Sequence, residues 1–155
     1  MKARDVWVLH GPNLNLLGRR EPKIYGRDTL AAIDARLEAL GRDLGLRVAS
    51  FQSNHEGALI DRLQIATEEA DGVLLNPGAF THTSLALADT LRAMTIPVVE
   101  VHLSNLYARD HARQSNLTAP ATTGVVMGFG SQSYELGLRA LDARIAGGRK
   151  RGRGI

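Results

Sequence analysis

The residues VWVLHGPNLNLLGRREPKIYG, numbered 6–26, give the first indication of how this chain folds. The continuous apolar run Val6–Leu9 is typical of a strand that is covered on both faces. The residues from His10 to Gly26 contain too many glycines and prolines for a helix or a strand. We therefore expect a buried strand that ends in a long loop.

Similar apolar runs recur along the chain, separated by segments with helical periodicity. The runs predict further strands at residues 47–52, 72–75, 97–103 and 124–127. The periodic segments predict helices at residues 30–44, from 56 on, 85–94 and 131–146. Strands that alternate with helices form a parallel sheet with helices on both faces. Five such units predict an α/β fold with a flavodoxin-like, doubly wound five-stranded parallel sheet in three layers.

Local signals mark where two of these helices begin and end. Asp28 or Thr29 can cap the helix that follows the first loop, and Gly45 can end it. Ser53 and Glu56 have the spacing of a capping box, in which the serine hydroxyl caps the next helix. We therefore expect Ser53 to be the cap of the second helix.

The composition fits a single globular domain. The chain has 155 residues, of which 44% are hydrophobic and 23% charged, so it can bury a core without a second domain. We expect residues 1–146 to form this domain and residues 147–155, which are mainly glycine and basic residues, to be a disordered tail. Cysteine is absent, which excludes disulfides and thiolate chemistry. With no signal peptide and no apolar run that could span a bilayer, we expect a soluble cytoplasmic protein.

The positive net charge does not indicate a nucleic-acid partner. The tail carries four of the positive charges, and removing these four from the formal net charge of +3 leaves the body at −1. A near-neutral body offers no basic surface to a phosphate backbone. Aromatic residues make up only 5% of the chain and do not alternate with basic ones, as a stacking surface would require. We expect neither nucleic acid nor membrane as a partner.

Polar side chains follow the predicted strands at their carboxyl ends. Ligands of doubly wound sheets bind beyond these ends, so reactive residues there indicate a site. The residues concerned are His10, Asn13, Ser53, Asn54, His55, Asn76, His82, His102 and Ser104, with Arg109 and Arg113 further on. Taken singly, each has an ordinary explanation, such as a helix cap or a solvated surface charge. Their convergence on one edge of the sheet favours a functional site.

The residue types at this edge favour acid–base chemistry without a cofactor. The chain has no Walker sequence, and its five histidines fall in different loops without a carboxylate at ligand spacing, so we expect no metal. Arg19 and Arg20 precede Tyr25, and a guanidinium favours the ionised form of a phenol, which can then act as a base. Arg20, Arg109 and Arg113 suit an anionic carboxylate.

Four segments, in this order, form a pattern more specific than any single residue. They are residues 11–26 (GPNLNLLGRREPKIYG), 52–57 (QSNHEG), 76–84 (NPGAFTHTS) and 100–105 (EVHLSN). In this combination the chain resembles the type II 3-dehydroquinate dehydratases, from about Val6 to Leu141. The resemblance implies a hydro-lyase of the shikimate pathway that converts 3-dehydroquinate to 3-dehydroshikimate. It implies trans elimination of water through an enolate, without metal or cofactor.

The resemblance also implies catalytic roles. Tyr25 matches the family's base, and Arg20 beside it would favour the phenolate form. Asn13 would orient a water that hydrogen-bonds the enolate oxygen. His102 matches the group that protonates the departing hydroxyl, and Glu100, two residues earlier on the same strand face, would orient His102.

Other positions match residues with which the family binds its substrate. They are Asn76, Gly78, His82, Leu103, Ser104, Arg109 and Arg113. Asn76 would hold either the departing hydroxyl or the imidazole of His102. Asp89 matches a residue that reaches the site of a neighbouring subunit, so the resemblance implies a homo-oligomer, a dodecamer built from trimers.

Two other interpretations stay open at this point. The chain could be a non-catalytic flavodoxin-like module that binds a small anionic ligand through its arginines, or a structural oligomeric shell. The presence of both Arg20 and Tyr25 favours the enzyme. Four positions depart from the residues usual in the resembled family, none of them at a proton-transfer position: Phe80, Ala112, Asn116 and Ala119.

Overall fold

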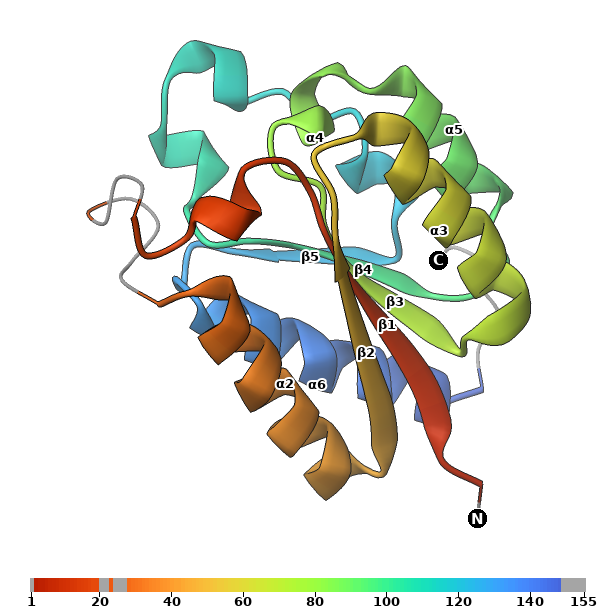
Figure 1. Cartoon of the computed structure of the whole chain (residues 1–155). Helices are drawn as coiled ribbons and strands as arrows, with labels where there is room; N and C mark the ends of the chain where they lie inside the picture. The colour runs from red at the N-terminus through yellow and green to blue at the C-terminus, as the bar shows by residue number, and fades with distance from the viewer. Residues whose placement is uncertain (1, 20–22, 24–27, 149–155) are drawn as a thin grey trace.

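A central parallel sheet organises the molecule. The computed structural model describes residues 2–19, 23 and 28–148. Within these residues the strands are β1 (Arg4–His10), β2 (Leu46–Gln52), β3 (Gly72–Asn76), β4 (Val98–His102) and β5 (Gly124–Met127). Their order in the sheet is β2-β1-β3-β4-β5, and every neighbouring pair is parallel (Figure 1). This order is that of the flavodoxin-like sheet, so the predicted fold class is confirmed.

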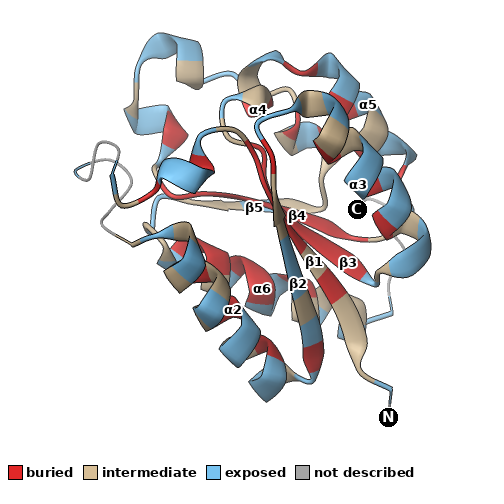
Figure 2. Cartoon of the chain, viewed as in Figure 1, coloured by how far each residue is buried: buried red, intermediate tan, exposed pale blue. Residues whose placement is uncertain are grey.

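Helices cover both faces of the sheet (Figure 1). The helices α2 (Leu30–Leu44) and α6 (Gln132–Ala146) pack on one face, and α3 (Glu56–Glu69) and α5 (Leu85–Ala93) on the other. Short helical turns occupy the loops: α4 (Phe80–Thr83), η1 (Leu14–Leu16), η2 (Leu106–Ala108), η3 (His111–Arg113) and η4 (Ala119–Ala121). Two apolar clusters fill the spaces between sheet and helices, and every residue of the central strands β3 and β4 is buried (Figure 2).

The limits of α2 agree with the predicted signals. The Thr29 hydroxyl accepts a hydrogen bond from the backbone N–H of Ala32 at 3.1 Å and so caps the helix. Gly45 follows the last turn with φ 74°, a left-handed conformation that glycine adopts without strain. Of the two candidate caps, Thr29 is therefore the one that is used.

The predicted capping box at the start of α3 is wrong. The helix begins at Glu56 and its cap residue is His55, whose side chain makes no capping hydrogen bond. The Ser53 hydroxyl instead accepts a hydrogen bond from the backbone N–H of His55 at 3.0 Å. Ser53 thus closes a tight turn inside the loop, one of the local bonds with which serine competes with helix capping.

The last helix, α6, ends at Ala146. The limits of the predicted domain stay a prediction. The tail lies outside the described residues from position 149 on, so its disorder stays a prediction. None of the helices in the described part is long and apolar enough to cross a membrane.

Candidate active site

A pocket lies where β1, β3 and β4 reach their carboxyl ends, as the topology of a doubly wound sheet leads one to expect. Its walls come from the loops that follow these strands and from the connection between β4 and β5. The lining residues are Pro12, Asn13, Leu14, Asn76, Gly78, Ala79, His82, His102, Leu103, Ser104, Leu106, Arg109 and Arg113.

Two glycines let the loops after β1 and β3 lie directly against each other. The backbone N–H of Gly11 donates to the carbonyl of Asn76 at 2.7 Å, and a Cβ at Gly11 would lie 2.5 Å from the carbonyl oxygen of Pro77. Gly78 has φ 58°, and a Cβ there would meet the carbonyl oxygen of Pro12 at 3.2 Å. This close approach places the Asn13 loop beside the Asn76 loop.

Asn13 has a backbone conformation that is rare for residues other than glycine. Its φ is 67°, and among the described residues it is the one non-glycine residue with positive φ. The Asn54 side chain, from the loop after β2, accepts a hydrogen bond from the Asn13 backbone N–H at 3.0 Å. Strained residues of this kind concentrate at functional sites, where the surrounding structure holds them in place.

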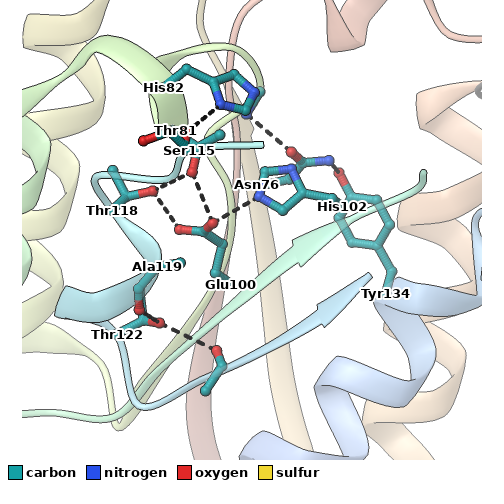
Figure 3. A network of polar contacts seen from close by, with 12 residues as sticks. Asn76, Thr81, His82, Glu100, His102, Ser115, Thr118, Ala119, Thr122 and Tyr134 are labelled. Atoms are coloured by element: carbon teal, nitrogen blue, oxygen red, sulfur yellow. Dashed lines mark hydrogen bonds and ion pairs between the residues drawn. The ribbon is translucent and has the colours of Figure 1, made fainter. Parts of the chain in front are cut away.

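Glu100 and His102 form a buried pair on β4. The Nε2 atom of His102 lies 2.7 Å from Oε2 of Glu100, and both side chains are almost completely buried (Figure 3). Two threonine hydroxyls also contact the carboxylate: Thr118 donates to Oε1 at 2.6 Å and Thr81 donates to Oε2 at 3.0 Å. The hydroxyls of Thr81 and Thr118 lie 2.7 Å apart.

The surroundings of Glu100 determine how His102 acts. A carboxylate accepts hydrogen bonds, and the Thr118 hydroxyl and Nε2 of His102 lie within donating distance of its two oxygens. Glu100 therefore keeps a proton on Nε2 of His102 and fixes the plane of the imidazole. The other nitrogen, Nδ1, is then the one that can exchange a proton with a molecule in the pocket.

Asn76 is buried at the end of β3 and has a fixed amide orientation. Its Oδ1 accepts a hydrogen bond from the backbone N–H of Gly78 at 3.0 Å, and its Nδ2 donates to the hydroxyl of Tyr134 at 3.0 Å (Figure 3). Burial raises the pKa of Tyr134 well above its usual range, an effect only partly opposed by the hydrogen bond from Asn76. The tyrosine is therefore neutral at physiological pH.

The connection between β4 and β5 folds back onto α4. Nδ1 of His82 lies 2.7 Å from the carbonyl oxygen of Ser115, and the backbone N–H of Leu117 donates to the carbonyl of Thr81 at 2.6 Å. In the same connection, Arg113 donates to the carboxylate of Asp110 at 2.6 Å. Arg109 and Arg113 of this connection line the pocket.

The structure brings most of the predicted site residues together. Glu100 lies behind His102, and the following residues line the pocket itself: Asn13, Asn76, Gly78, His82, His102, Leu103, Ser104, Arg109 and Arg113. Asp89 does not line it, because it lies on the exposed side of α5 and pairs with Arg92 at 3.4 Å. Arg20 and Tyr25, the predicted base and its partner, lie outside the described residues.

Three buried hydroxyls next to the site were missed from the sequence. Thr81 lies within the segment 76–84, but its neighbour Glu100 is 19 positions away. Thr118 lies in a connection without periodicity, and Tyr134 occupies a core position of α6. Only the placement of Thr81 inside a recognisable segment offered a signal. In the described part of the chain, no three His, Asp or Glu side chains are grouped so that they could hold a metal ion.

Comparison with known proteins gives a consistent result. The family model described as dehydroquinase class II matches residues 4–142. The chain belongs to the class II dehydroquinase family. Among curated relatives of this dehydroquinase, the 3-dehydroquinate dehydratase of Rhizobium johnstonii is 55% identical over 139 residues, which are 90% of this chain and 96% of the relative. The 3-dehydroquinate dehydratase of Desulforudis audaxviator is 53% identical over 144 residues, 93% of this chain and 96% of the relative.

Solved structures of class II dehydroquinases share the fold. The type II dehydroquinase of Propionibacterium acnes superposes with a TM-score of 0.88 at 39% identity, covering 91% of this chain and 97% of the other. The type II dehydroquinase of Butyrivibrio crossotus also gives a TM-score of 0.88, at 36% identity, covering 92% of this chain and 99% of the other. The resemblance found in the four sequence segments is thus confirmed for the family.

Proposed function

We propose that this dehydroquinase uses the pocket at the sheet edge to dehydrate 3-dehydroquinate, the reaction in the names of its curated relatives. The enzyme is a hydro-lyase of the shikimate pathway, and its products are 3-dehydroshikimate and water. The observation that supports the proposal most strongly is the buried Glu100–His102 pair beside a pocket lined with amides and arginines. These groups supply acid–base chemistry without a cofactor.

In the first step a base removes a proton from the carbon next to the ketone. Tyr25 as phenolate takes this proton, with Arg20 favouring the charged form. The electron pair of the broken C–H bond moves into the carbonyl group and gives an enolate. A water held by the Asn13 side chain donates a hydrogen bond to the enolate oxygen, and such preorganised donors contribute about 3 kcal/mol.

In the second step the hydroxyl departs from the neighbouring carbon on the opposite face. His102 gives its Nδ1 proton to the oxygen as the C–O bond breaks, while the enolate electrons form the C=C bond of the enone. Glu100 stabilises the imidazolium before this transfer and holds the ring afterwards. Tyr25 ends protonated and His102 neutral, so both regain their starting states by proton exchange with solvent. Asn76 holds the departing hydroxyl.

The remaining pocket residues bind the substrate. Arg109 and Arg113 suit its carboxylate, and His82, Ser104 and the backbone at Leu103 offer hydrogen bonds to its hydroxyls. The competing interpretation, a module that binds an anion without turnover, needs the arginines alone. That interpretation does not explain why a carboxylate and an imidazole are buried together at the pocket edge. Burial of ionisable groups costs desolvation free energy, and such groups concentrate at functional sites.

An ultraviolet assay tests the proposal, because the enone product absorbs and the substrate does not. Purified protein should give rising absorbance with 3-dehydroquinate. His102→Ala and Tyr25→Phe should each lower kcat by about 100-fold or more, the usual contribution of a positioned acid or base. His111→Ala is the matched control, since His111 lies exposed on η3 and should leave kcat unchanged. A folded, assembled wild-type protein that gives no absorbance change would contradict the proposal.

Two further parts of the proposal concern the assembly of the enzyme and its location in the cell. We propose a dodecamer of trimers in which Asp89 reaches a neighbouring site, and its exposed position on α5 is compatible with that role. We also propose a cytoplasmic location, as for an enzyme of small-molecule biosynthesis. The assembly and the location both stay predictions.

A further inference from the structure

A series of hydrogen bonds connects Asn76 to the two helices α6 and α2, which pack on the same face of the sheet. The hydroxyl of Tyr134, which accepts from Asn76, lies 2.8 Å from Nδ1 of His10, and Nε2 of His10 lies 2.8 Å from Oδ1 of Asp34. His10 and Tyr134 are both completely buried, while Asp34 is partly exposed on α2. These hydrogen bonds join the four elements β3, α6, β1 and α2, and Figure 3 shows the bond between Asn76 and Tyr134.

One set of directions gives each donor in this series of hydrogen bonds an acceptor. The N–H of Gly78 requires an acceptor, so Asn76 must turn Oδ1 toward Gly78 and Nδ2 toward Tyr134. The Tyr134 oxygen then accepts from Asn76 and gives its own proton to Nδ1 of His10. In this arrangement Nδ1 of His10 accepts from Tyr134, and the N–H at Nε2 donates to Oδ1 of Asp34.

In this arrangement, one amide hydrogen of Asn76 is not used in the hydrogen bond to Tyr134. The Nδ2 atom carries two hydrogens, of which Tyr134 takes one. Asn76 also lines the pocket, next to His102. The second hydrogen is thus available to an oxygen in the pocket, and the amide cannot turn its oxygen there without placing two donors against each other at Gly78.

We propose that Tyr134 and His10 are positioning residues, which fix the Asn76 amide as a hydrogen-bond donor toward the departing hydroxyl. The inference rests on the proposed function, since only the dehydration gives Asn76 a hydroxyl to hold. Tyr134 supplies the acceptor that orients the amide, and His10 supplies the acceptor that orients the Tyr134 hydroxyl. Neither residue lines the pocket.

Two ligands are used to test whether Tyr134 and His10 position the Asn76 amide or only pack in the core. They are competitive inhibitors with the ring and carboxylate of 3-dehydroquinate, one carrying the hydroxyl that leaves and the other carrying hydrogen in its place. Tyr134→Phe keeps the ring in the core and removes only the oxygen. It should lower kcat about tenfold, the effect of one hydrogen bond, and weaken binding of the hydroxyl ligand several-fold while leaving the other ligand unaffected.

Variants of His10 supply a rescue experiment. The side-chain oxygen of Asn can replace Nδ1 as the acceptor for Tyr134, so His10→Asn should retain most of the preference for the hydroxyl ligand, whereas His10→Leu should lose it. Tyr107→Phe is the control, because Tyr107 is an exposed tyrosine outside the pocket lining. Thermal unfolding of each variant checks that it is folded.

Different results would contradict the positioning role and the proposed function. Equal weakening of both ligands in Tyr134→Phe, or equal losses in His10→Asn and His10→Leu, would show a packing role and overturn the inference. Unchanged kcat and unchanged ligand preference in Tyr134→Phe would overturn it as well. A wild-type enzyme without activity on 3-dehydroquinate would instead refute the proposed function, so the two failures are distinguishable.

Discussion

Glu100 is a buried carboxylate that depends on two threonine hydroxyls as well as on His102. Removing one donor leaves a buried carboxylate oxygen without its hydrogen bond, which costs about 1–3 kcal/mol. Thr118→Val keeps the side-chain shape and should lower the free energy of unfolding by about this amount, measured in urea. It should also lower kcat, because a displaced Glu100 no longer holds His102.

Thr122→Val provides the matched control for this prediction. Thr122 lies in the same connection, and its hydroxyl donates to the carbonyl of Ala119 at 2.8 Å rather than to the carboxylate (Figure 3). Its replacement should leave kcat unchanged. Equal losses of kcat in both variants would mean that the connection as a whole matters, and not the hydroxyl at Glu100.

At the level of residues, the sequence could predict neighbours that are close along the chain. Glu100 and His102 were paired because residues two apart on a strand share a face, and the structure places them in contact. Thr118 could not be predicted, because it reaches Glu100 from 18 positions away through a connection with no periodic pattern. Tyr134 has the helical spacing of a core residue, and nothing in that spacing shows that its hydroxyl meets Asn76.

At the level of elements, the packing of α6 against the sheet leaves no room for a side chain at Gly137. A Cβ on this residue would lie 2.6 Å from Cγ1 of Val101 and 2.8 Å from Cδ1 of Leu74. Gly137→Ala should therefore overpack the core and destabilise the protein by about 1–3 kcal/mol. Gly57→Ala on α3 is the control, since a Cβ there meets nothing within 4 Å. Thermal unfolding should show a lower Tm for the first variant alone, and an unchanged Tm for Gly137→Ala would mean that α6 can shift freely.

Asp28 joins the start of α2 to the loop before α6. Its carboxylate accepts from the Ser131 hydroxyl at 2.6 Å and from Arg36 at 2.8 Å, and these hydrogen bonds lower the pKa of Asp28. A lowered pKa means that folding favours the ionised form. The resulting stability is fully present above the unfolded pKa of about 3.9, and it is lost as the pH falls through the folded pKa.

Asp28→Asn should therefore lower Tm near pH 7, and the difference from wild type should shrink below about pH 4. Thermal unfolding across this pH range measures the effect. Asp61→Asn, at an exposed position on α3, should leave Tm nearly unchanged at every pH. A Tm difference for Asp28→Asn that is constant with pH would point to lost packing instead of lost charge.

Elements with a strong periodic pattern were predicted nearly to the residue, whereas loop structure was not. The limits of α2 follow from a cap and a glycine that the sequence shows directly. The short turns η2, η3 and η4 lack such a pattern, because three-residue turns have no repeat to detect and depend on tertiary contacts such as that of His82 with Ser115. The error at Ser53 has a different reason, because a serine hydroxyl can either cap a helix or close a local turn, and here it bonds within its own loop.

For the whole molecule, the oligomer carries the main prediction. Sedimentation at micromolar concentration should give a dodecamer, and monomer alone would contradict it. Asp89 is 78% exposed and lies outside the pocket lining of its own chain, so Asp89→Ala should raise KM only through a neighbouring subunit. Asp61→Ala serves as a control for loss of an exposed carboxylate. An unchanged KM in the assembled Asp89→Ala enzyme would exclude a contribution from the neighbour.

The bond between His10 and Tyr134 spans almost the whole chain, since the two residues are 124 positions apart. A ribosome that adds roughly 5–20 residues per second needs about 6–25 s to synthesise the intervening segment. During this time β1 exists without the helix that supplies the partner of its histidine. Because Tyr134, Leu138 and Leu141 of α6 belong to the core cluster on one face of the sheet, this face is completed only after the last helix has been made.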